Sequence, residues 1–140
     1  MSVSKNEFFR RVEKVREGRE IRPKFSTLPS GTLYAKRAMN IAILEAATRR
    51  MRIWVLYRKA TTDEEKGYLL EPYSYRYKWV RRGPQDYPGS TLQKVLYGYD
   101  RADSTIKMFV KNRILKVVIT RYYFWPRWTV EILPSGSRLE

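Results

Sequence analysis

The sequence predicts an α+β protein in which one or two helices precede an antiparallel sheet of five or six strands. Three observations favour this class. Apolar residues recur at helical spacing in two segments before residue 50. After that point the chain contains short runs rich in β-branched and aromatic residues, separated by turns. No crossover helix is expected between these runs, so the strands should form an antiparallel barrel or a strongly curved sheet.

The two predicted helices lie near the N-terminus. Ser4 and Glu7 have the spacing of a capping box, so the first helix is expected to begin there. Gly18 is expected to end it, and the prolines and glycine that follow predict an irregular connector. An apolar stripe and good helix formers predict a second helix from about Leu33 to Arg50.

The strand predictions rest on alternating or continuous apolar runs bounded by turn residues. Pro72 is expected to break or kink the second strand, because proline cannot donate a backbone hydrogen bond. With 140 residues we expect one domain, in which residues 1–32 are a helix and connector and residues 33–140 form the barrel or curved sheet. The expected strands are residues 52–58, 68–80, 92–99, 105–110, 114–120 and 127–133.

The charge and composition indicate a partner and exclude several kinds of site. The chain has 29 Lys and Arg against 14 Asp and Glu, a net charge of +15. This excess favours a polyanionic partner, because each neutralised phosphate releases condensed counterions. Without His or Cys there is no disulfide, no ordinary zinc site and no histidine general base. We therefore expect a non-enzymatic cytoplasmic protein without a cofactor or a membrane partner.

Alternation along residues 105–113 predicts a binding surface. One face of this strand is expected to be an apolar backing, and the other a series of cations interleaved with one aromatic ring. Such a face is typical of nucleic-acid binding, where cations contact phosphates and a ring stacks on a base. The alternative is that the lysines form only the solvent face of a half-buried sheet. The apolar face consists of Ile106, Met108 and Val110. The opposite face consists of the cations Lys107, Lys111 and Arg113 and the aromatic ring of Phe109.

A second series, of aromatic residues at alternating positions, lies on the predicted strand around residue 75. It has cations on the opposite face, so it could serve as a platform on which bases stack. Tyrosine and tryptophan are also favoured in cross-strand packing at the edge of a core, and we favour that structural interpretation. The aromatic residues are Tyr73, Tyr75, Tyr77 and Trp79, with Arg76 and Lys78 opposite.

Residues from about Ile41 to Ile132 resemble the WYL-domain family. In that family a helix leads into a strand ending in Tyr-Arg, as at Tyr57-Arg58, and an acidic-Pro pair follows, as at Glu71-Pro72. The naming strand, W-Y-L-x-A-Y, falls on residues 94–99, and the R-T-F-R-L-D-R-I strand falls on residues 107–114. The matching residues are Leu96, Tyr99, Phe109, Arg113 and Ile114, whereas Lys94, Val95 and Val110 depart from the pattern.

The resemblance implies an SH3- or Sm-like small β-barrel. It also implies a role in binding nucleic acid or a nucleotide-like ligand, often to regulate an attached module. Family members commonly carry a winged-helix DNA reader before this domain, and residues 1–32 are too short for one. The chain is therefore expected to be a divergent, stand-alone version, of the sort found in phage or other mobile elements.

These observations predict a non-enzymatic, regulatory module that binds single-stranded nucleic acid or a nucleotide-like ligand. One alternative is a basic adaptor that binds an acidic protein partner. A less favoured one is a Mg²⁺-dependent nuclease that uses the carboxylates of residues 63–65. DNA versus RNA, sequence preference and oligomeric state stay open. The predicted phosphate contacts are Arg58, Lys107, Lys111 and Arg113, and the predicted stacking residues are Phe109 and Tyr57.

Overall fold

The computed structural model describes residues 2–17, 28–81 and 90–131. Its helices and strands confirm the α+β class predicted from the sequence. None of the helices in these segments is long and apolar enough to cross a membrane. The elements in chain order are β1 (Val3–Ser4), α1 (Lys5–Glu17), α2 (Arg37–Arg49), β2 (Met51–Arg58), β3 (Glu65–Arg81), β4 (Ser90–Asp100), β5 (Thr105–Val110), the 3-10 turn η1 (Lys111–Arg113) and β6 (Ile114–Tyr123).

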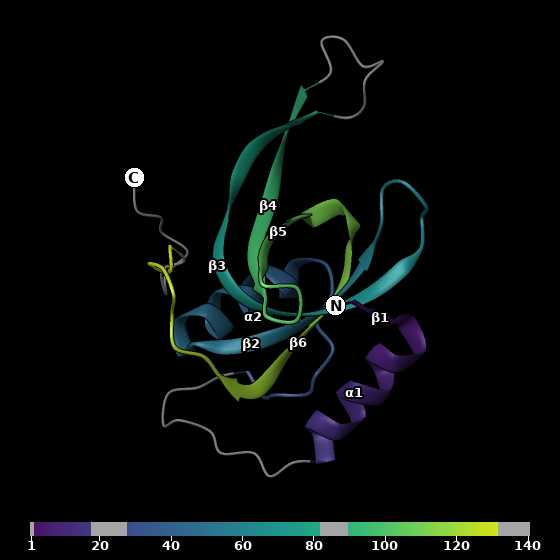
Figure 1. Cartoon of the computed structure of the whole chain (residues 1–140), viewed down its shortest axis with the longest axis vertical. Coiled ribbons are helices and arrows are strands. Elements are labelled where there is room, and N and C mark those ends of the chain that lie inside the picture. Colours follow the sequence, from purple (N-terminus) through teal and green to yellow (C-terminus); the bar gives the residue numbers. More distant parts are fainter. Residues whose placement is uncertain (1, 18–27, 82–89, 132–140) are drawn as a thin grey trace.

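The six strands form one antiparallel sheet. Its order is β5-β4-β3-β2-β6, and β1 pairs with β3 off this path. Within the described residues no pairing joins β5 to β6, so the sheet is open and the predicted closed barrel is not formed. The three residues of η1 nevertheless connect these two ends of the sheet, which therefore has to curve strongly. Figure 1 shows β5 and β6 meeting through this short turn.

The long strand β3 belongs to two parts of the sheet. Its first half pairs with β2 and β1, and its second half pairs with β4. The register shifts between Pro72 and Ser74, which confirms the kink predicted at that proline. Beyond this point β3 and β4 continue as a two-stranded arm that projects away from the helices (Figure 1).

Strand β2 is covered on both of its faces. Ile53 and Val55 are fully buried and belong to the main core with α2 and the inner faces of the other strands. Trp54 and Leu56, on the opposite face, pack with Phe8 and the other apolar residues of α1. Residues 53–56 are all apolar because both faces of this part of β2 are buried, so none of the four side chains faces water.

The helix predictions are correct in number, and the start of the second is shifted. The Ser4 side chain accepts a hydrogen bond from the Glu7 amide (3.2 Å), as the capping box requires. Helix α2 begins at Arg37 instead of Leu33, because Tyr34 forms two backbone hydrogen bonds with Val117 in β6, each 2.8 Å long. The predicted helix end at Gly18 lies outside the described residues.

The strand expected at residues 127–133 is absent from its described part, residues 127–131. This segment packs on Tyr73 instead. The Tyr73 hydroxyl accepts a hydrogen bond from the Arg127 amide (2.9 Å), and the Tyr73 carbonyl accepts one from the Glu131 amide (2.8 Å). Trp128 adds an edge-to-face contact with the Tyr73 ring at 5.3 Å. These contacts anchor the segment without a strand ladder.

Substitution of Phe8 tests the contribution of α1 to stability. Phe8 is fully buried and meets the Trp54 ring edge-to-face at 6.3 Å. We expect Phe8→Ala to lower the free energy of unfolding by about 3 kcal/mol, measured by urea denaturation. Lys14→Ala, on the exposed side of α1, is the control and should change it by less than about 0.5 kcal/mol. Equal effects of the two substitutions would contradict the packing of α1 on β2.

Candidate nucleic-acid interface

The six residues predicted to bind nucleic acid lie at one end of the sheet but in separate environments. Tyr57, Lys107 and Phe109 line one open hollow of about 370 Å³. Arg58 and Arg113 meet at the turn between β2 and β3. Lys111 lines a second hollow, which is described below. The structure therefore does not bring these side chains into one exposed row.

The two faces of β5 are divided as predicted, but the inner and outer faces are reversed. Phe109 is only 2% exposed, whereas Ile106 and Met108 are 50% and 42% exposed. Phe109 is held by edge-to-face contacts with Tyr57 and Tyr68, at 5.0 and 5.1 Å between ring centres. Phe109 is thus packed as a core residue and not exposed as expected, and its predicted stacking on a base stays a prediction.

Lys107 lies on the same inward face and is bound to two carboxylates. Its ammonium group is 2.9 Å from Asp100 and 2.5 Å from Asp103, and it lies 5.2 Å from the Tyr68 ring centre. Burial raises the pKa of Asp100, but the hydrogen bond and charge of Lys107 outweigh this effect, so the pKa lies below its ordinary value. The side chain of Lys107 neutralises a buried acid.

Arg113 holds the turn between β2 and β3. Its guanidinium group donates to the carbonyls of Arg58 (2.7 Å) and Lys59 (2.9 Å) and to the carboxylate of Asp63 (3.0 Å). Arg58 itself contacts Glu65 at 3.4 Å. The carboxylates of residues 63–65 are therefore used in ion pairs with neighbouring cations. Across the described segments, no group of three or more His, Cys, Asp or Glu residues is arranged to hold a metal ion.

The aromatic series on β3 divides where the arm leaves the body. Tyr73 and Tyr75 are buried, and burial raises the pKa of the Tyr75 hydroxyl. Tyr77 and Trp79, farther along the arm, are 55% and 66% exposed. The structural interpretation of this series holds for its inner pair, while the outer pair presents two rings to solvent.

Cations lie beside several tyrosine rings on both faces of the arm. Arg76 and Lys78 lie 5.7 and 5.5 Å from the centre of the Tyr97 ring. Lys94 lies 4.4 Å from the centre of the Tyr75 ring, at the base of the arm. Such distances fit cation–π interactions. We call these residues the arm cluster: Arg76, Tyr77, Lys78 and Trp79, which are exposed, and Lys94 and Tyr97, which are half-buried.

Few acidic residues accompany the arm cluster. From residue 72 to residue 98 the sequence has five basic residues and one acidic residue, Asp86. Glu131 approaches Arg76 at 3.9 Å. The alternating rings and cations of β3 are visible in the sequence, but the predicted binding residues lie elsewhere. The local charge imbalance is the signal that could have pointed to the arm as a candidate surface.

The ion pairs of Lys107 lead to a pH-dependent prediction. Removing the ammonium leaves Asp100 buried with its main partner lost, so we expect Lys107→Met to lower the free energy of unfolding by about 2 kcal/mol at pH 7. Because the pKa of Asp100 is depressed in the folded state, this contribution is present above about pH 4 and is lost as the pH falls through the folded-state pKa. The difference between wild type and variant should therefore shrink in acid.

Lys111→Met is the matched control for that measurement, because in the described part of the chain Lys111 has no ion pair. Its effect on stability should be small at every pH. Chemical denaturation between about pH 2 and pH 7 measures both variants. A pH-independent effect of Lys107→Met would contradict the assigned ion pair.

Comparison with known proteins does not assign the chain to a family. No protein-family model and no curated protein matches it. Its fold is similar to part of proteasome accessory factor B/C (PafBC) of Arthrobacter aurescens, with 18% sequence identity and a TM-score of 0.48. The match covers 86% of this chain and 17% of that chain, so the chain spans a small part of the length of PafBC.

Proposed function

We propose that this chain is a non-enzymatic module that binds single-stranded nucleic acid through the arm cluster. The observation that carries the proposal is the exposure of Tyr77 and Trp79 on one face of the projecting arm, where Lys94 lies 5.7 Å from the Tyr77 ring centre. Arg76 and Lys78 alternate with these rings and lie on the opposite face, next to Tyr97. Aromatic rings next to positive charge suit single strands, because unpaired bases have free faces for stacking and the backbone attracts cations.

The proposed roles follow from the chemistry of each side chain. Tyr77 and Trp79 stack on bases, while Arg76, Lys78 and Lys94 contact phosphates. The outer part of the arm has exposed side chains on both faces, Arg76 and Lys78 on one and Tyr77 and Trp79 on the other. A flexible single-stranded oligonucleotide can therefore contact the cations of one face and the rings of the other. A duplex offers fewer accessible base faces, and we expect it to bind more weakly.

The residues chosen from the sequence have a different role in this proposal. Phe109, Lys107 and Arg113 build the scaffold from which the arm projects, through the ring contacts and ion pairs described above. The regulatory role and the relationship to the WYL-domain family belong to the proposal as well. The short connection of β5 to β6 supports that relationship, because it brings the two ends of the open sheet toward each other, as in a small barrel.

Salt dependence tests the phosphate contacts. The logarithm of the binding constant for an oligonucleotide should fall linearly with the logarithm of salt concentration. We expect Arg76→Ala combined with Lys78→Ala to reduce this slope by about 1.4 units, since each phosphate contact with a single strand contributes about 0.7. Fluorescence anisotropy with labelled single-stranded DNA and RNA measures the slope.

Lys14→Ala combined with Arg101→Ala removes the same charge away from the arm and serves as the control. Equal slopes for the two double variants would contradict the arm as the contact surface. Binding to poly-glutamate as tight as binding to the oligonucleotide would favour the acidic-protein alternative instead.

Trp79 provides a separate test of base stacking. Loss of one stacked base costs about 1–3 kcal/mol, so we expect Trp79→Ala to weaken oligonucleotide binding by at least about fivefold with little change in salt slope. Leu92→Ala is the control, because Leu92 pairs with Trp79 across the arm and is similarly exposed but has no ring. An equal loss in both variants would point to general disruption of the arm.

A further inference from the structure

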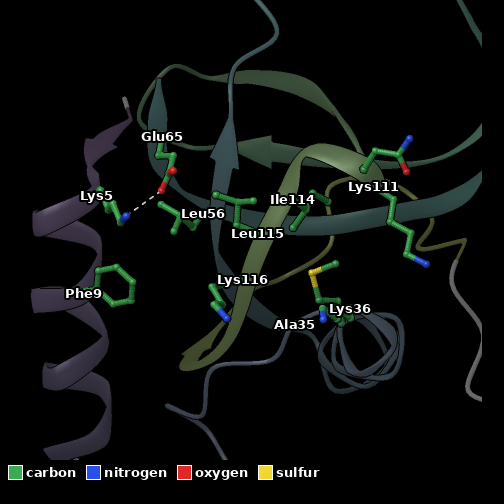
Figure 2. Close-up of a pocket in the computed structure, with 12 residues that line it drawn as sticks. Lys5, Phe9, Ala35, Lys36, Leu56, Glu65, Lys111, Ile114, Leu115 and Lys116 are labelled. Carbon is green, nitrogen blue, oxygen red and sulfur yellow. Dashed lines mark ion pairs between the residues drawn. The ribbon is translucent and has the colours of Figure 1, made fainter. Parts of the chain in front are cut away.

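A second hollow, of about 520 Å³, lies between α1, the start of α2 and β6 (Figure 2). Four lysines from four different elements line it. Lys5 comes from α1, Lys36 is the N-cap of α2, Lys111 lies in η1, and Lys116 lies in β6. The topology thus gathers cations that are far apart in the sequence.

The positive charge of this hollow is only partly neutralised. Glu65 also lines it and contacts Lys5 at 3.1 Å and Arg58 at 3.4 Å (Figure 2 marks the first contact). By contrast, Lys36, Lys111 and Lys116 form no ion pair within the segments that the structure describes. Like charges around one concave surface raise the local potential and favour an anion there.

Apolar side chains form the walls between the lysines. They are Phe9 of α1, Met39 of α2, Leu56 of β2 and Leu115 of β6. A volume of about 520 Å³ falls within the range of small-molecule sites, which combine apolar walls with a few polar groups. The hollow therefore suits a ligand that has both an anionic part and an apolar part.

The backbone at Lys36 is strained. Its φ and ψ angles are 53° and −125°, a combination that glycine adopts readily and residues with a side chain rarely adopt. A lysine at this position keeps its ammonium group on the hollow at the expense of backbone strain. Strain of this kind is concentrated at functional sites.

We propose that this hollow binds a small organic ligand with at least two phosphate groups and an apolar or aromatic body, the class that includes nucleoside polyphosphates. Several phosphates are required because the lysines are distributed over four elements around the hollow. The body of the ligand would contact Phe9, Met39 and Leu115. The site is separate from the arm cluster, so the two proposals can fail independently.

Calorimetry with ATP as the probe, at low salt and without added metal, tests the site. We expect saturable binding to the full chain and a loss of at least about tenfold in affinity for Lys111→Ala combined with Lys116→Ala. The control is Lys14→Ala combined with Arg101→Ala, which removes the same charge outside both the hollow and the arm and should leave the affinity unchanged. No saturable binding by the wild type, or equal losses in both double variants, would overturn the proposal.

Two further ligands separate the anionic and apolar contributions. Adenosine lacks the phosphates and inorganic triphosphate lacks the body, so each should bind at least about tenfold more weakly than ATP. Triphosphate that binds as tightly as ATP would overturn the assignment to an organic ligand. Adenosine that binds as tightly as ATP would overturn the role of the lysines.

Lys36→Gly distinguishes a binding role from a structural one. Glycine accepts the positive φ without steric cost, so the thermal midpoint of the variant should not fall. The missing ammonium group should nevertheless weaken ATP binding severalfold. Unchanged ATP affinity in this variant would overturn the role assigned to Lys36.

Discussion

The connection of the two ends of the sheet through three residues is the constraint on which the other features depend. Because β5 and β6 are at opposite ends of the strand order, a turn as short as η1 forces the sheet to curl. The curl places Phe109 of β5 against Tyr57 of β2 and Tyr68 of β3. It also leaves the end of β3 and the start of β4, which pair only with each other over residues 77–81 and 90–94, outside the curved body as the arm.

The sequence was sufficient for most of the elements, apart from β1 and the strand expected at residues 127–133, but insufficient for the direction in which their faces point. The bounds of β5 agree with the prediction, because β-branched residues and flanking turns mark them locally. Alternation shows which residues share a face, but both faces of β5 contain apolar side chains. Partners on other strands, Tyr68 of β3 and Asp100 of β4, make the Lys107 face the inner one. The start of α2 depends in the same way on Val117, which is far away in the sequence.

The excess of positive charge was predictable from composition, whereas its distribution was not. Carboxylates from separate turns neutralise Lys107 and Arg113, so two residues with the expected sequence pattern have structural roles. The arm and the hollow beside α1 retain their positive charge because few acids fold next to them. A count of charges along the chain cannot reveal this difference, since the acids and bases that meet belong to different elements.

The short strand β1 has a consequence for how the protein behaves at high concentration. Val3 and Ser4 pair with Gly67 and Lys66 on the side of β3 that β2 leaves open. An uncovered strand edge is a template on which other chains can add, and such addition leads to aggregation. Two residues ahead of the first helix thus shield a vulnerable part of the sheet, and chains that lack them would be prone to self-association.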